Sequence, residues 1–180
     1  MTLDPISSNV IKVKVQDQEF DVMKHIHSSL IIFGHSTHVF LVQAKDKTYH
    51  ILKDAWLLAN HGISAITVLS KINDILEKDD SEDAKTYQLM HPQFVVGEEI
   101  GDSTKAQRGR LTDTPPDHVH HQVVTGPVGD PLTSFCSREE FVQVLLDCVK
   151  CKSNVQYQRY QLLFQGLNIC TPNATWYMVT

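Results

Sequence analysis

The sequence predicts an α+β fold, in which an antiparallel sheet is combined with a small number of helices. Apolar and polar residues alternate in short runs separated by polar turns through the first third of the chain, as they do in antiparallel strands. Apolar residues then recur every three or four positions over residues 63–76, which indicates an amphipathic helix. The chain has 180 residues, 42% of them hydrophobic and 21% charged, enough for one ordinary domain with a core.

The segments before the helix predict an antiparallel meander. Residues 10–15, VIKVKV, alternate strictly, and a polar turn separates them from a second short strand at 19–23. A brief apolar run at 30–33 stops at a polar stretch that contains a glycine. The strand pattern resumes at 38–44 and, after the tight turn AKDK, at 48–55, so these two segments predict a hairpin.

The segments after the helix predict further strands and a buried helix. Residues 93–100 read as a strand, and the polar, breaker-rich residues 101–117 predict a long loop of the kind that is often functional or disordered. Residues 118–128 predict another strand, broken by glycines and prolines. A capping-box pattern opens the helix expected over 137–151, which is apolar on most of its circumference. The last thirty residues show no clear period and predict an irregular tail.

Charge and hydropathy exclude several classes of function. The net charge of −5 and the lack of a polybasic run give no footprint for nucleic acid or for a membrane surface. The N-terminal segment lacks the apolar core of a signal peptide, and no stretch approaches the ~20 apolar residues of a spanning helix. We therefore expect an intracellular protein, in the cytoplasm or nucleus, with its cysteines as reduced thiols. These are Cys136, Cys148, Cys151 and Cys170.

Two patterns raise the alternative of a metal or small-ligand site. Cys148 and Cys151 form a single C-x-x-C, but a structural zinc site needs four ligands and no histidine follows His121. His118, His120 and His121 cluster, yet on a strand the first two lie on one face and the third on the other. Ordinary packing of small or half-buried residues explains both patterns better, and no metal-binding residue is predicted.

A lysine stands in an otherwise apolar and aromatic strand, TYHILKDAW, at position 53. A lone lysine near a strand end is most often a surface residue. Three longer stretches give it more meaning: FGHSTHVFLV to YHILKDAW at 33–56, PQFVVGEEI to AQRGR at 92–110, and HVHHQVVTGPVGDPLTSFCSREEFVQVLLD at 118–147. Together they resemble the fungal-type protein kinase family over about residues 10–150.

The resemblance implies a kinase-like small lobe that contacts ATP. Lys53 would be the third-strand lysine that touches the α- and β-phosphates. Gly34 and Ser36 would belong to the turn that covers the phosphates, and the link containing Gly126, Val128 and Asp130 would lie along the adenine. The implied organisation is a small lobe with its hinge at 10–136, the first large-lobe helix at 137–151 and a tail without family resemblance at 152–180.

The chain also departs from the family pattern. Ser36 replaces the second glycine of the turn, and its Cβ hinders the approach of backbone N–H groups to phosphate. Ala65 stands where the family has the helix glutamate that pairs with the lysine. No H-R-D-like or D-F-G stretch occurs, and no Asp or Glu follows Asp147. The chain is also shorter than the roughly 250 residues of a two-lobed kinase.

These departures predict a partial fungal-type kinase domain that is catalytically inactive. We expect ATP to bind weakly, Mg²⁺ not to be held, and no residue to serve catalysis, because the carboxylates that clamp the metal and accept the proton are missing. The alternative is a pseudokinase-like module that binds ATP or not and uses the 137–151 helix and the acidic EKDDSEDAK segment to contact a protein partner. Left uncovered, the apolar helix would make the isolated chain marginal or adhesive.

Overall fold

The structure is a computed structural model, and its chain divides into two compact units. One contains Met1–His61 and Phe94–Gly126, and the other contains Gly62–Gln93 and Pro127–Thr180. The structure describes residues 2–3, 10–29, 36–59, 64–82, 84–85, 88, 92–108, 116–131, 134–146 and 177–178.

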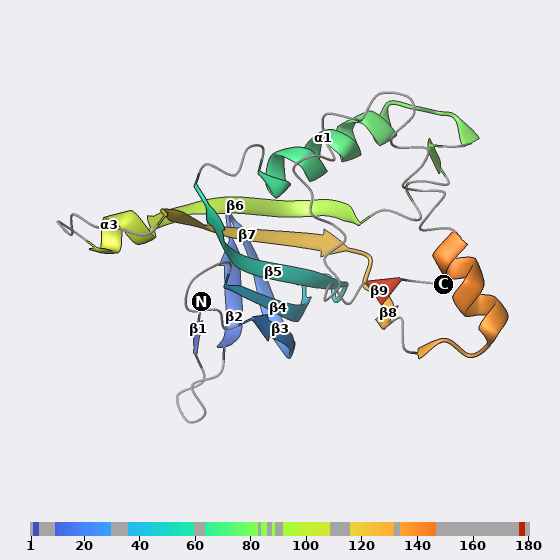
Figure 1. The fold of residues 1–180 in the computed structure, drawn as a ribbon, viewed down its shortest axis with the longest axis horizontal. Coiled ribbons are helices and arrows are strands. Elements are labelled where there is room, and N and C mark those ends of the chain that lie inside the picture. Colours follow the sequence, from blue (N-terminus) through green and yellow to red (C-terminus); the bar gives the residue numbers. More distant parts are fainter. Residues whose placement is uncertain are drawn as a thin grey trace. The chain divides into compact units, whose positions relative to one another are not determined.

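The first unit is built on an antiparallel sheet, as the sequence predicts. Its seven strands lie in the order β1-β2-β3-β4-β5-β7-β6 (Figure 1). At one end of the sheet the spatial order departs from the chain order: β6 forms the edge, and β7 lies between β6 and β5. The bounds are β1 Thr2–Leu3, β2 Val10–Val15, β3 Gln18–Ser29, β4 Thr37–Gln43, β5 Tyr49–Leu58, β6 Gln93–Ser103 and β7 His118–Gly126.

Two tight turns join the first four long strands, at the positions that the sequence predicts. Gln16, with a φ of 51°, turns β2 into β3, and Lys47, with a φ of 73°, turns β4 into β5. Asp46 stabilises the second turn by accepting hydrogen bonds from the backbone N–H and the hydroxyl of Thr48. β3 and β5 extend further than predicted, to Ser29 and Leu58. The apolar run at 30–33 lies outside the described residues.

The sheet curls, so that strands from both of its ends share one core. The side-chain amide of Gln16, in the β2–β3 turn, donates to the carbonyl of Gly97 on β6 at 2.8 Å. The core contains side chains from each of the six strands β2 to β7. Burial of these side chains away from water is the main term that stabilises the unit. The buried members of the core are Val13, Val15, Phe20, Phe40, Val42, Leu52, Val96 and Val124.

The predicted loop at 101–117 is wrong in its first part. β6 continues to Ser103, and a short helix, α3 Thr104–Arg108, follows it. Asp117, twelve residues away, accepts hydrogen bonds from the backbone N–H of Lys105 at 2.7 Å and the hydroxyl of Thr104 at 3.1 Å. The hydroxyl of Ser103 caps the same helix locally by accepting from the backbone N–H of Ala106 at 3.1 Å, so the helix start combines a local cap with a distant residue that local sequence patterns do not reveal.

The second unit contains the predicted amphipathic helix, α1 Ala65–Glu77. Ser64 caps it by accepting a hydrogen bond from the backbone N–H of Thr67, and Val68 and Ile72 are its buried residues. A short ladder joins β8 Asp130–Pro131 to β9 Tyr177–Met178.

The helix predicted over 137–151 is described over 138–146. The hydroxyl of Ser137 accepts a hydrogen bond from the backbone N–H of Glu140, as the capping-box pattern predicts. The Glu140 carboxylate reaches back one residue further than expected, to the backbone N–H of Cys136 at 2.6 Å. Residues 147–151 and most of the predicted tail at 152–180 lie outside the described residues. Among the described helices, none is long and apolar enough to cross a membrane.

Candidate functional site

Lys53 lies in the middle of β5, flanked by the two strands that pair with it. Its Cα is in register with Val39 on β4 and with Val123 on β7. Because side chains alternate along a strand, Lys53 shares its sheet face with these two valines and with Ile51 and Ala55 of its own strand. The ammonium therefore rises from an apolar surface of small and branched side chains.

The surroundings of Lys53 change its protonation equilibrium. The residue is exposed. Protein atoms around its ammonium nevertheless displace part of the water that would solvate the charge, and this partial burial lowers the pKa of Lys53 below its ordinary value. No carboxylate offsets the loss: within the described residues Lys53 forms no ion pair, and desolvation is the single cause of the shift.

The position at which the sequence lacks a carboxylate is the first residue of α1. Ala65 follows the cap Ser64 directly, and the first turn of the helix contains no acidic residue. α1 carries two carboxylates, Asp74 and Glu77, both in its C-terminal half. The helix thus offers no acid at the place where the family resemblance expects one.

Ser36 lies at the end of the turn that precedes β4. Its carbonyl accepts a hydrogen bond from the backbone N–H of Trp56 at 2.9 Å, and its hydroxyl lies 3.5 Å from the carbonyl of Ser29. Ser36 is therefore fastened to β5 three residues beyond Lys53. Gly34, the other turn residue implicated by the sequence, lies outside the described residues.

The predicted link residues are divided between the two units. Gly126 ends β7 in the first unit, and a Cβ at this position would lie 3.0 Å from Nδ1 of His50, so a side chain would be crowded there. Val128, which is half-buried, and Asp130, which begins β8, belong to the second unit.

The opposite face of β5 carries a buried polar network that the sequence did not indicate. Asp54 is 4% exposed, and its two carboxylate oxygens each lie 2.7 Å from a nitrogen of β7, one from Nε2 of His120 and the other from Nε2 of Gln122. The ring of Trp56 stacks on that of His120, with centroids 4.7 Å apart and 5° between the planes. Strict alternation places Asp54 opposite Lys53, but it does not reveal burial or partners.

Two further histidines, His121, which is buried, and His50, which is half-buried, each have one buried ring nitrogen that is unsatisfied among the described residues. Nδ1 of His50 and Nδ1 of His121 have no hydrogen-bond partner within the described part of the chain. Burial lowers the pKa of both rings, while the nearby carboxylates of Asp46 and Glu99 oppose the shift for His50 and His121 respectively. Both histidines are therefore held as neutral groups near pH 7.

The patterns that suggested a metal can be examined only in part. His120 and His121 lie on opposite faces of β7, as strand alternation predicts: His120 bonds Asp54, and His121 lies 3.8 Å from Glu99 of β6. Among the described residues, no group of three or more potential ligands is arranged to hold a metal ion. Cys148 and Cys151 lie outside those residues.

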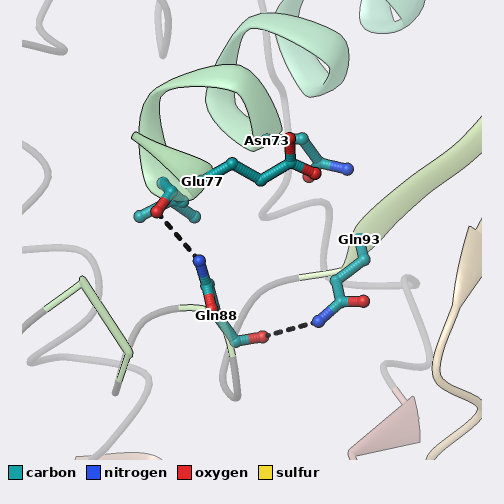
Figure 2. Close-up of a pocket in the computed structure, with 5 residues that line it drawn as sticks. Asn73, Glu77, Gln88 and Gln93 are labelled. Atoms are coloured by element: carbon teal, nitrogen blue, oxygen red, sulfur yellow. Dashed lines mark hydrogen bonds between the residues drawn. The ribbon is translucent and has the colours of Figure 1, made fainter. Parts of the chain in front are cut away.

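The second unit contains a small polar cavity of about 200 Å³ at the C-terminal end of α1. Figure 2 shows its amide side chains, of which Gln88 donates to the carbonyl of Leu76 at 2.8 Å and Gln93 donates to the carbonyl of Gln88 at 3.4 Å. Glu77 and Asn73 complete the lining. These hydrogen bonds cap the helix end, and the cavity includes none of the residues implicated by the sequence.

Comparison with known proteins gives a family for the chain. No protein of curated function matches it. The family model described as fungal protein kinase matches residues 2–163, which include every strand of the seven-stranded sheet, the helices α1, α3 and 138–146, and Lys53. The lysine-bearing strand, the helix that follows it and this match lead to one conclusion: the chain belongs to the fungal protein kinase family.

Proposed function

We propose that this chain is a kinase-like small lobe with its hinge and the first large-lobe helix, that it binds ATP weakly through Lys53, and that it transfers no phosphate. Protein kinases transfer the γ-phosphate of ATP to a hydroxyl, and their third-strand lysine contacts the α- and β-phosphates. Counted from β3, the strand β5 is third, and α1 follows it in the chain. The resemblance in sequence and this order of elements support the same assignment.

The observation that carries the proposal is the unpaired ammonium of Lys53. It is exposed, lies on an apolar sheet face and has no ion-pair partner among the described residues. Phosphate would supply the missing negative charge, so the residue fits the phosphate-contacting role. The absence of an acid at Ala65 removes the usual orienting partner, which is why we expect the affinity to be low.

The proposed inactivity follows from the carboxylates of this sequence. Phosphoryl transfer requires an Asp to accept the hydroxyl proton and an Asn with a second Asp to hold Mg²⁺. The family places these after the helix that begins near residue 137, and no Asp or Glu follows Asp147 in this sequence. Several described acids before that helix lie in strands, in turns or on α1, among them Asp54, Asp46 and Glu77, and none of these stands in the expected catalytic loop.

A thermal-shift titration with ATP, with and without Mg²⁺, tests the nucleotide part of the proposal. We expect ATP at millimolar concentration to raise the melting temperature of the chain, and Mg²⁺ to add little. Lys53→Ala should abolish the shift, whereas Lys12→Ala, which removes a lysine that pairs with Asp21 on the sheet edge, should leave it unchanged. An ATP shift that survives Lys53→Ala would contradict the assigned role.

A radiolabel assay tests the proposed inactivity. Purified chain incubated with labelled ATP, Mg²⁺ or Mn²⁺ and mixed protein substrates should transfer no label to them or to itself. Enzymic transfer that disappears in Lys53→Ala would overturn the proposal, because it would require metal and base carboxylates that this sequence does not offer in the expected place.

A second candidate function, a protein-binding module, is favoured by the surface of helix 138–146. Val142, Leu145 and Leu146 are 52%, 43% and 48% exposed. Apolar side chains of this size lose about 1.5–3 kcal/mol each when they are left in water, so a protein partner that covers them would be stabilised. Replacing Leu145 and Leu146 by Lys should reduce self-association in light scattering and binding of an apolar dye; unchanged values would argue against this surface.

A further inference from the structure

Directly behind Lys53, strands β5 and β7 are cross-linked by side chains. The Lys53–Val123 pair is adjacent to the Asp54–Gln122 pair in the register of the two strands. On the face opposite Lys53, the Asp54 carboxylate is hydrogen-bonded to Nε2 of His120 at 2.7 Å and accepts a hydrogen bond from Nε2 of Gln122 at 2.7 Å. Asp54 of β5 is therefore joined to two residues of β7, His120 and Gln122, by two short hydrogen bonds to its single carboxylate.

An aromatic contact joins the next pair of residues on the same face of β5 and β7. Trp56 is in register with His120, and their rings stack at 4.7 Å. His120 is consequently held from two sides, by the carboxylate of Asp54 and by the indole of Trp56. Asp54 and Gln122 are buried, at 4% and 2% exposure, so water does not compete for these hydrogen bonds.

Stability alone does not explain a buried carboxylate at this position. Removing a carboxylate from water carries a desolvation cost, and well-packed apolar residues of similar volume often stabilise a fold as well or better. What a saturated polar network adds is a single geometry, because each hydrogen bond is satisfied in only one arrangement of the two strands. The geometry fixed here is that of the backbone from which Lys53 projects.

The orientation of the Lys53 side chain depends on that backbone more than the orientation of an ion-paired lysine would. It has no ion pair among the described residues, so no partner on its own face orients its ammonium. We propose that Asp54, held by His120 and Gln122, is a positioning residue that fixes the direction of Lys53 toward a bound polyphosphate from the opposite face of the sheet. This inference rests on the proposed ATP binding at Lys53 and assigns the residue that supports it.

Two readouts test the inference, and only one of them requires ATP. The first is the titration of the Lys53 ammonium, followed by NMR of ¹³C-methylated lysines and assigned with Lys53→Arg. The partial burial that lowers the pKa of Lys53 makes it distinguishable from exposed lysines. The second is the Kd for ATP, measured by calorimetry at a temperature where circular dichroism shows each variant to be folded.

Asp54→Ala is the main variant. It should return the Lys53 titration toward that of the other lysines and raise the Kd for ATP about tenfold, in line with the ~10–100-fold contributed by outer partners that orient a metal ligand. Asp54→Asn should stay near the wild type in both readouts, because an Asn amide can accept from Gln122 and donate to the other tautomer of His120. If Asp54→Ala does not fold, His120→Ala carries the same expectations while leaving Gln122 on Asp54.

Val13→Ala is the matched control. It removes volume from the core on β2, three strands from β5, and lowers global stability without touching the network. It should change neither the Lys53 titration nor the Kd. If Asp54→Ala or His120→Ala behaves like Val13→Ala in both readouts, the positioning role is wrong. If the wild-type chain binds no ATP, the proposed function fails, and the Lys53 titration still decides whether Asp54 positions the lysine.

Discussion

Lys53 and Asp54 are neighbours on β5, and their charged groups lie in opposite environments on the two faces of the strand. The ammonium of Lys53 lies on an exposed face with no ion pair among the described residues, and its surroundings lower its pKa. The carboxylate of Asp54 is buried and accepts two hydrogen bonds at 2.7 Å. One face therefore carries a complete polar network, while the other carries a charge without an ion pair among the described residues.

The difference separates residues that maintain the fold from residues that would serve a ligand. A buried carboxylate without its donors would destabilise the chain, so the whole network must persist for the sheet to persist. Lys53 makes no such demand, because its exposed ammonium keeps part of its hydration without a protein partner. The sheet therefore depends on the Asp54 network, whereas it does not depend on an ion-pair partner for Lys53.

The largest difference in stability between the two faces is expected at two adjacent apolar residues of β5, Leu52 and Ile51. Leu52 is fully buried in the core on the Asp54 face, whereas Ile51 is half-buried on the Lys53 face. Leu52→Ala should lower the free energy of unfolding by about 4 kcal/mol, and Ile51→Ala by about half as much or less. Urea denaturation measures both. Equal losses would mean that the two faces are equally packed, and the comparison would fail.

The next effect concerns the network itself. Asp54→Ala should destabilise the chain by about 3 kcal/mol, because Gln122 and His120 lose their acceptor in a buried site. Asp21→Ala is the matched control, since Asp21 is exposed and its ion pair with Lys12 has N and O 3.5 Å apart; its loss should cost less than about 1 kcal/mol. Similar losses for the two variants in urea denaturation would show that the network adds nothing beyond a surface ion pair.

Local patterns predicted the strands, the turns and α1, because each depends on alternation, helical period or a neighbouring cap. Asp46 and Ser64 bond residues within three positions of themselves, and the turn at Gln16 depends on the backbone conformation of that residue. α3 was missed because the residue that fastens its start, Asp117, lies twelve positions away. Helix termini completed by distant side chains are not visible in a sequence window.

The candidate site was predictable to the same extent. The residue pattern predicted the strand that became β5, and the family resemblance singled out Lys53 on it. The partners of Asp54 could not be predicted, because they come from β7, 66 and 68 residues further along the chain, and are set by the strand register. Roles for Gly34, Val128 and Asp130 stay predictions.

A pH titration compares buried histidines on both faces. His50 lies on the Asp54 face and His121 on the Lys53 face, and burial lowers the pKa of each below the value of 6.5 expected in the unfolded chain. The unfolded chain therefore binds the proton more readily. Their contribution to stability is complete above pH 6.5 and is lost as the pH falls through the folded-state pKa of each ring.

Urea denaturation between pH 8 and pH 5 measures this loss, and His121→Gln should make the pH dependence less steep over that range. The carboxylates of Asp46 and Asp117 do not interfere, because hydrogen bonds lower their pKa values below 3.8 and their contribution is lost in a more acidic window. A free energy of unfolding that stays constant from pH 8 to pH 5 would contradict the burial of neutral histidines on either face.

The smallest effect on stability is expected at Lys53, and its sign is informative. Because burial lowers the pKa of Lys53, the protonated form is held less well in the folded chain than in the unfolded one, and stability should rise as the pH passes above the folded-state pKa toward 10.5. Lys53→Met removes the ammonium and keeps the apolar stem. It should leave the free energy of unfolding within about 1 kcal/mol of the wild type, on the stabilising side.

Lys12→Met is the matched control, because Lys12 is exposed and pairs with Asp21. It should have the opposite sign and be slightly destabilising, by less than about 0.5 kcal/mol. If Lys53→Met instead destabilised the chain by an amount comparable to Asp54→Ala, the ammonium would have a structural partner and the two faces of β5 would not differ. If it is neutral or stabilising and also removes the response to ATP, the lysine is retained at a small cost to the fold for the sake of a ligand.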